Sequence, residues 1–188
     1  MPTTLGHAMV GLGCGAFAYN KELPKRANLS MLATLGGLSV LPDLDVIAFG
    51  LGIPYRHLFG HRGFFHSLLF VGLCALVSWV IFRMSIKLYS EKTPAWHSLM
   101  IFLVVAISHP LLDMMTNGGL GIALFAPFSE ERFFLPMRPI PVSPIGISWR
   151  LYSIFAWEAA VLGPVVAVTW IGRLLVSFFM VKENADVA

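Results

Sequence analysis

The sequence predicts an all-α integral membrane protein, a single domain built from about five hydrophobic helices. Hydrophobic residues make up 57% of the 188 residues and charged residues only 12%. Soluble domains carry roughly 25% charged residues, so this chain has too few to coat a water-soluble surface. Its apolar residues gather in long segments, as expected of bilayer-crossing helices. No second compositional block divides residues 1–188, which favours one domain.

Five apolar segments follow one another along the chain. They span residues 4–19, 29–51, 64–88, 96–115 and 151–181. The last four reach the length of about 20 residues that a membrane crossing needs, whereas the first is short and marginal. Gly11 and Gly15 in the first segment form a small-xxx-small pair, typical of close helix packing. Pro42 interrupts the second segment, where we expect it to kink the helix.

A long connection, residues 117–150, separates the last two segments and is rich in proline, phenylalanine and arginine. Connections of this length without regular structure are usually functional lids or disordered. Aromatic residues such as Phe125 and Phe133 argue against disorder. We therefore expect the connection to fold back on the membrane surface, over a site at this end of the helices.

The basic residues indicate how the chain is oriented. If every segment crosses, eight lysines and arginines lie opposite the N-terminus and five lie on its own side. The eight are Lys21, Lys25, Arg26, Arg83, Lys87, Lys92, Arg173 and Lys182, and the five are Arg56, Arg62, Arg132, Arg138 and Arg150. The positive-inside rule then makes the side opposite the N-terminus cytoplasmic. The net charge of +3 is spread over several connections, so it does not indicate nucleic-acid binding.

Ionisable residues from four segments lie at a similar depth. At a rise of about 1.5 Å per residue, all of them fall near the N-terminal side of the membrane. They are His7, Asp43, Asp45, His61, Arg62, His66, His109 and Asp113. Unrelated buried histidines would have no reason to agree in depth. Because ionisable groups inside a membrane are costly and usually functional, the agreement predicts one shared site.

The spacing and chemistry of these residues predict a metal site. His109 and Asp113 are four residues apart, so they share a helix face and can chelate one ion. His61 and His66 are five residues apart, so we expect one of them in the turn before the helix. Imidazole and carboxylate suit zinc, with manganese or iron as alternatives, and the set is large enough for one or two ions. The predicted ligands or immediate neighbours are His7, Asp45, His61, His66, His109 and Asp113.

Other residues receive supporting roles. Asp43 is predicted to act as general base or to orient a ligand histidine, and Arg62 to bind a substrate phosphate. Asn117 either lines the substrate site or caps the helix. Glu158 is an additional ligand, a base or an ion-pair partner of Arg150, and the ion pair is the preferred interpretation.

Four remaining residues are expected outside the site. His57 lies in a polar loop, and His97 falls at the opposite end of its segment. Cys14 and Cys74 both sit inside apolar runs, so we expect unpaired packing residues rather than a disulfide or a cysteine metal motif.

Several motifs resemble one bacterial family. His7, residues 41–45 (LPDLD), residues 60–67 (GHRGFFHS) and residues 108–113 (SHPLLD) are similar to the YdjM-like family of inner-membrane proteins, with residues 127–134 fitting as well. These proteins are regarded as metal-dependent hydrolases, and some are linked to LexA control. The resemblance covers nearly the whole chain and implies a multi-pass protein of the bacterial inner membrane. Together with the orientation expected from the basic residues, it predicts a site on the periplasmic side.

The family is in turn distantly similar to zinc-dependent phospholipase C and P1-type nucleases. In those helical proteins an early His, an Asp, a His and a His-xxx-Asp pair hold a zinc cluster. His7, Asp45, His61, His109 and Asp113 occupy matching places in order. A second downstream His-xxx-Asp pair is missing here, so the resemblance implies one or two ions rather than three.

The residues and the resemblance together predict a membrane-bound metal-dependent hydrolase. It would cleave a phosphoester of a lipid, a lipid-linked substrate or a phosphorylated small molecule, using a metal-activated water. The alternative is a non-hydrolytic metal-binding membrane protein or an ion or proton transporter. The cytoplasmic halves of the segments are nearly bare of polar residues, which favours a one-sided pocket over a transport path.

Overall fold

The computed structural model describes residues 2–21, 23–86, 95–144 and 148–186. Within them the helices are α1 (Thr4–Ala18), α2 (Lys25–Val40), α3 (Ile47–Gly50), α4 (Leu68–Ile86), α5 (Ala95–Met114) and α6 (Arg150–Asp186), with 3-10 turns η1 (Leu41–Val46) and η2 (Phe64–His66). The predicted all-α class is therefore confirmed. Lys87, Lys92 and the side chain of Lys182, which were used to predict orientation, lie outside the described part.

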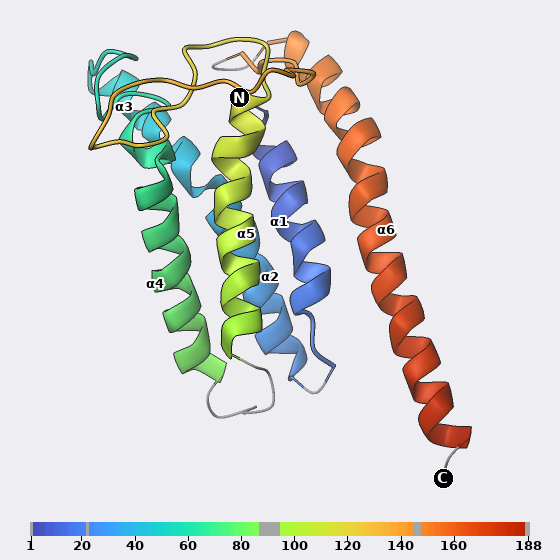
Figure 1. Ribbon diagram of the computed structural model, residues 1–188. Coiled ribbons are helices and arrows are strands. Elements are labelled where there is room, and N and C mark those ends of the chain that lie inside the picture. Colours follow the sequence, from blue (N-terminus) through green and yellow to red (C-terminus); the bar gives the residue numbers. More distant parts are fainter. Residues whose placement is uncertain (1, 22, 87–94, 145–147, 187–188) are drawn as a thin grey trace.

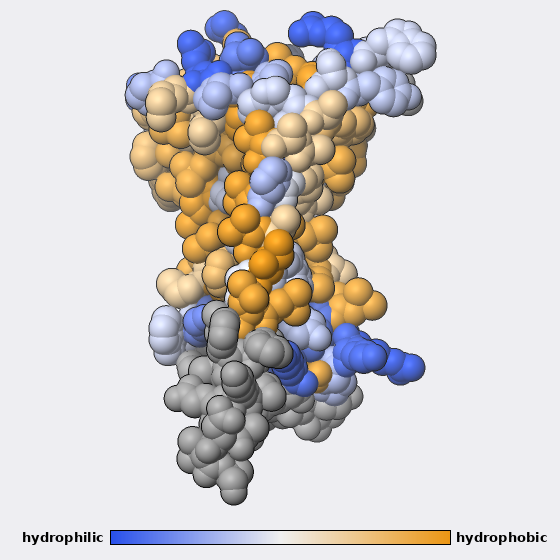
Figure 2. Space-filling view, turned by 90° about the vertical axis from the view of Figure 1, so that its right-hand side faces the viewer, coloured by the Kyte–Doolittle hydropathy of each residue, from blue (hydrophilic) through white to orange (hydrophobic). Residues whose placement is uncertain are grey.

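Within the described residues, four helical stretches are long and apolar enough to cross a membrane. They are Lys25–Gly50, Leu68–Ser85, Ala95–Met114 and Arg150–Leu175. The shorter apolar helix α1 has 15 residues, which gives a length of about 22 Å against a hydrocarbon core of about 30 Å. Apolar side chains cover the middle of the face drawn in Figure 2, and hydrophilic side chains gather toward its ends.

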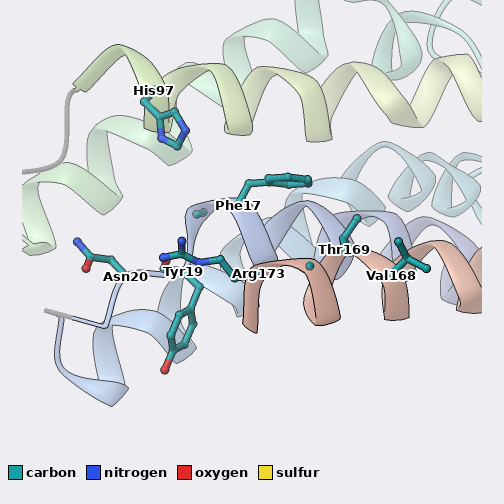
Figure 3. Close-up of a pocket in the computed structure, with 9 residues that line it drawn as sticks. Phe17, Tyr19, Asn20, His97, Val168, Thr169 and Arg173 are labelled. Atoms are coloured by element: carbon teal, nitrogen blue, oxygen red, sulfur yellow. The ribbon is translucent and has the colours of Figure 1, made fainter. Parts of the chain in front are cut away.

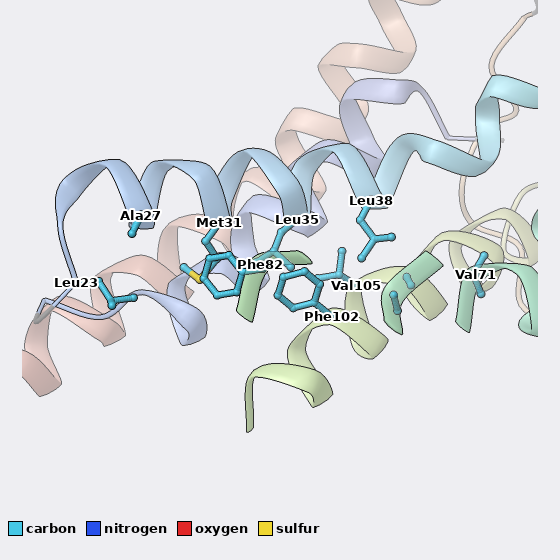
Figure 4. Packing of buried hydrophobic residues seen from close by; sticks show 11 residues of the cluster. Leu23, Ala27, Met31, Leu35, Leu38, Val71, Phe82, Phe102 and Val105 are labelled. Carbon is cyan, nitrogen blue, oxygen red and sulfur yellow. The ribbon is translucent and has the colours of Figure 1, made fainter. Parts of the chain in front are cut away.

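The helices run alternately up and down, so that the N-terminus, α3 and the long connection meet at one end of the molecule (Figure 1). Helices α1, α2, α4 and α5 form the bundle, and α6 packs mainly along α1. The bundle's lower half holds a tight apolar core that includes Met31, Leu35, Phe82, Phe102 and Val105 (Figure 4). The site end therefore lies above a closely packed apolar core.

Glycines let α1 approach α2 closely. A Cβ atom on Gly11 would lie 2.7 Å from the carbonyl oxygen of Leu35, and one on Gly15 would lie 2.3 Å from Leu32 Cδ2. At Gly11 the near atom is backbone, so a larger residue would push the helices apart, whereas at Gly15 the Leu32 side chain would have to move. The predicted packing role of the Gly11–Gly15 pair is confirmed.

Pro42 divides the second predicted segment. Because proline has no N–H and its ring clashes with the preceding turn, α2 ends at Val40 and the chain tightens into η1. Successive residues of a 3-10 turn are about 120° apart, which brings Asp43 and Asp45 closer in direction than an α-helix would. Both aspartates are buried as a result.

The segment before α4 is turn rather than helix. We expected α4 to begin at residue 64, but Phe64–His66 forms η2 and α4 begins at Leu68. His61 thus lies in a turn and His66 in η2, in line with the expectation that one histidine precedes the helix. Arg62 between them has a φ of 61°, an uncommon value for a side-chain-bearing residue.

The connection between α5 and α6 packs over this turn, as predicted. Isolated bridges join Thr116 to Ile140 and Ile122 to Phe133. The Arg132 guanidinium donates to the carbonyl oxygens of Tyr55 and Arg62, at 3.2 Å each. One side chain thereby ties the connection to the loop that carries His61 and Arg62.

Candidate metal centre

Four buried residues from three elements could hold one metal ion. His7 comes from α1, Asp43 from η1, and His109 and Asp113 from α5. One ligand atom from each lies within 4.8 Å of every other. The i, i+4 pair on α5 therefore does meet the early histidine of α1, across the end of the bundle.

His66 approaches the same carboxylates from η2. Its Nε2 atom lies 3.3 Å from Asp113 Oδ2 and 3.6 Å from Asp43 Oδ1. His7 Nε2 lies 3.6 Å from Asp113 Oδ1, and His109 Nε2 lies 3.5 Å from Asp43 Oδ1. Two ligands that each stand about 2.0–2.1 Å from one tetrahedral ion are themselves about 3.3 Å apart. The spacing of these atoms is that of a ligand shell.

The converging atoms have charged neighbours but make no hydrogen bond to the described residues. Both ring nitrogens of His7 and His66, Nε2 of His109, and all four carboxylate oxygens of Asp43 and Asp113 are buried without a hydrogen bond. Buried polar groups are normally paired, because each unpaired one costs about 1–3 kcal/mol. So many unpaired nitrogen and oxygen atoms around one point fit a divalent cation.

The charges of the cluster point the same way. Asp43, Asp45 and Asp113 bring three negative charges, and Arg62 brings one positive charge, so these four side chains sum to −2, and a protonated His66 makes the sum −1. Burial acts to lower the pKa of His66, yet the facing carboxylates of Asp113, Asp43 and Asp45 raise it well above its ordinary value. The site is therefore a strongly negative pocket, suited to a cation.

Asp45 is placed differently from Asp43. His61 Nδ1 lies 2.6 Å from Asp45 Oδ1, the Arg62 backbone N–H donates to Oδ2 at 2.9 Å, and His66 Nδ1 lies 3.0 Å from Oδ2. Asp45, His61 and His66 form a second group that could hold a metal. Both oxygens of Asp45 are nevertheless engaged within the protein, whereas those of Asp43 are not.

The candidate ligand His109 on α5 is oriented by a backbone carbonyl group. His109 Nδ1 lies 2.7 Å from the carbonyl oxygen of Ser39, near the end of α2. A ring nitrogen that donates to a carbonyl leaves Nε2 as the acceptor that a metal needs. This contact with Ser39 carries no signal in the sequence.

Arg62 lies inside the cluster and is fully buried. Its Nε lies 3.4 Å from Asp113 Oδ2, Nη2 donates to Thr116 Oγ1 at 3.0 Å, and Nη1 donates to the Gly118 carbonyl at 2.9 Å. Thr116 Oγ1 in turn donates to the Asp113 carbonyl oxygen at 2.7 Å. The guanidinium therefore holds Asp113 and the start of the long connection together.

Glu158 and Asn117 make structural hydrogen bonds outside the cluster. Glu158 is buried and accepts hydrogen bonds from the backbone N–H and the hydroxyl of Thr3, the N-cap of α1. No ion pair joins it to Arg150 in the described chain, so the preferred interpretation was wrong. Asn117 is exposed, and its Oδ1 accepts from the Val142 N–H at 3.0 Å.

The residues expected outside the site are outside it. His57 is exposed in its loop, and Cys14 and Cys74 are both free. His97 lines a cavity of about 680 Å³ at the opposite end of the bundle, together with Phe17, Tyr19 and Arg173 (Figure 3). That cavity contains none of the cluster residues.

Comparison with known proteins identifies relatives over most of the chain. The model of the YdjM inner membrane protein family matches residues 1–184. This chain belongs to the YdjM inner membrane protein family. It is 38% identical to the inner membrane protein YbcI of Escherichia coli K12, over 79% of this chain and 80% of the relative. It is 30% identical to the YdjM inner membrane proteins of Escherichia coli K12 and Shigella flexneri, over 72% of this chain and 70% of each relative. No solved structure matches.

Family membership confirms the resemblance drawn from the motifs. The protein is thus an inner membrane protein of the YdjM family, with four candidate spans and two buried groups of His and Asp residues that could hold metal ions. The residues of both groups all belong to the motifs that pointed to this family.

Proposed function

We propose that this YdjM-family protein is a metal-dependent hydrolase that cleaves a phosphoester of a lipid or lipid-linked substrate. The observation that carries the proposal is that His7, Asp43, His109 and Asp113 could together hold one ion, with their ligand atoms buried and without a hydrogen bond. His66 Nε2 lies within 3.6 Å of both carboxylates. When bound there, a divalent cation such as zinc supplies Lewis acidity toward a phosphoryl oxygen and an activated water.

The protein's own residues prepare this chemistry. His7, Asp43, His66, His109 and Asp113 would hold the cation. Asp45 would position His61 and His66, because its two oxygens face their Nδ1 atoms. This exchanges the roles that the sequence indicated for Asp43 and Asp45, and it leaves His61 as a general base or a ligand of a second ion.

Arg62 would act within this arrangement by fixing Asp113. Its guanidinium already contacts Asp113, Thr116 and the Gly118 carbonyl. A substrate phosphate that reached the cation would meet the positive charge of Arg62 beside it. We place the site on the periplasmic side. This is supported by the excess of lysine and arginine in the segments expected at the opposite end of the helix bundle.

The rival function is metal or proton transport. A transport path needs polar groups along the depth of the membrane. Below the cluster, however, the bundle is closed by apolar side chains including Leu35, Phe102 and Val105. This packing favours a pocket open at one end over a path through the protein.

One experiment separates the two functions. Purified protein is reconstituted into vesicles that contain phosphatidic acid and other phospholipids, and both phosphate release and metal uptake are measured with zinc or manganese. We expect phosphate release that requires metal and is lost in Asp113→Asn, while Glu131→Gln, an exposed carboxylate, keeps it. Metal uptake without turnover would reject hydrolysis in favour of transport.

A further inference from the structure

An apolar groove borders the His and Asp cluster beyond the C-terminal end of α2. It has a volume of about 380 Å³ and lies between the η1–α3 segment and the segment around η2. Its lining is apolar apart from Asp45 and includes Leu44, Ile47, Ala48, Leu51 and Phe65. Asp45 is the one charged residue among them, and it also belongs to the second group of metal-binding residues.

The groove is bordered by apolar side chains that the protein itself does not cover. Leu44, Ile47, Leu51 and Phe59 are 57%, 61%, 72% and 46% exposed. Leu44 and Ile47 lie within one of the apolar stretches long enough to span the membrane, Lys25–Gly50, and Leu51 follows directly after it. In water such a patch would be unfavourable, but at the edge of a bilayer it faces lipid. The groove therefore opens toward acyl chains rather than toward the aqueous phase.

Position and chemistry together define an occupant. A ligand that fills the groove needs an apolar chain, and its other end would lie at Asp45, whose Oδ2 is 3.0 Å from His66 Nδ1 beside the cation site. The aromatic rings of Phe59, Phe65 and Phe70 provide a wide wall for such a chain. A lipid with an anionic phosphate at its end matches both requirements, with the chain in the groove and the phosphate at the metal.

We infer that this groove is the chain-binding subsite of the enzyme, so that the substrate class is a membrane lipid monophosphate that enters sideways from the bilayer. The inference rests on the proposed hydrolase function and adds where the lipid binds. It also places substrate entry on the η1–α3 side of the cluster, away from the connection that covers the solvent side.

The test measures binding, which does not depend on turnover. Zinc-loaded protein is exchanged into amphipol, and methyl, butyl and hexyl phosphate are titrated by calorimetry. Burial of one methylene group contributes about 0.8 kcal/mol, so affinity should rise up to about fourfold per methylene in the wild type. Ala48→Phe fills the groove and Leu51→Ser makes its rim polar, so both variants should flatten this rise and leave methyl phosphate binding unchanged.

The matched control is Leu175→Ser. Leu175 is 53% exposed on α6 and does not line the groove, so this variant should retain the full dependence on chain length. Because Leu51 is exposed, Leu51→Ser should fold even if Ala48→Phe does not, and zinc content verifies each variant.

The outcomes of the titrations distinguish the groove inference from the proposed hydrolase function. Chain-dependent binding that both groove variants reduce supports the inference, and if no phosphate is then released, only the hydrolase function fails. Binding that is independent of chain length, or unaffected by the groove variants, overturns the inference even when phosphate is released. A dimer that the groove variants convert to monomers would assign the groove to a second copy of the chain, which also overturns it.

Discussion

Arg62 is a charged side chain that the protein buries completely beside a buried carboxylate. Removing its charge leaves Asp113 uncompensated, and breaking a buried ion pair in this way costs about 3–5 kcal/mol. A bound cation would compensate the same carboxylate. Arg62→Met should therefore lower the melting temperature strongly in chelator and much less with zinc.

Thermal denaturation in detergent, with and without zinc, measures this difference. The exposed Arg26→Met variant is the control and should melt like the wild type in both conditions. If Arg62→Met lowers the melting temperature equally with and without zinc, zinc does not compensate for the loss of Arg62, and the proposed link between Arg62 and the metal centre is wrong.

The two aspartates of η1 make opposite predictions. The unpaired oxygens of Asp43 face His66 and His109, whereas those of Asp45 are engaged by His61 and the Arg62 N–H. Asp43→Asn should abolish zinc binding, whereas Asp45→Asn should weaken it about 10–100-fold, as loss of a residue that orients ligands does. Zinc titration against a chelating dye ranks the variants, and the reverse order would return Asp45 to the ligand position given by the sequence.

At the scale of the elements, α1 carries His7 and is positioned by its packing on α2. A methyl group on Gly11 would meet the Leu35 carbonyl and Ser39 Oγ, each at 2.7 Å. Gly11→Ala should push α1 away, lower stability by about 1–3 kcal/mol and weaken zinc binding through the shift of His7.

The control for Gly11→Ala lies on the neighbouring helix. A Cβ atom on Gly37 of α2 would meet nothing within 4 Å. Gly37→Ala should be neutral or slightly stabilising, since alanine favours helix. Melting temperature and zinc content are compared for both variants, and an undisturbed Gly11→Ala protein would show that α1 packing does not set the site.

The same elements show what the sequence could predict. Hydropathy located every long helix, and the agreement in depth of His7, His109 and Asp113 predicted that they meet. Which of Asp43 and Asp45 keeps unpaired oxygens could not be predicted, because it depends on how η1 turns after Pro42 and on which carboxylate the Arg62 N–H reaches. The partner of Glu158 was also missed, because Thr3 lies 155 residues away in the chain.

At the scale of the whole molecule, the proposed orientation rests on the placement of the charges. The N-terminus lies at the site end, and the chain between α1 and α2 lies at the opposite end (Figure 1). Lys21, Lys25 and Arg26 belong to that turn and the start of α2. In a background lacking Cys14 and Cys74, Phe128→Cys should react with an impermeant maleimide from the periplasm of intact cells. Lys21→Cys should react only after permeabilisation, and the opposite pattern would place the site on the cytoplasmic side.

The central claim is that the buried cluster binds a divalent metal. The most direct measurement is metal content by mass spectrometry on detergent-purified protein, beside the His109→Ala and Asp113→Ala variants. One or two equivalents of zinc or manganese in the wild type, lost in both variants, is the predicted result. Protein purified without chelator that holds no metal, and takes up none when it is added back, would contradict the claim and assign the buried histidines and aspartates to a proton or ion pathway.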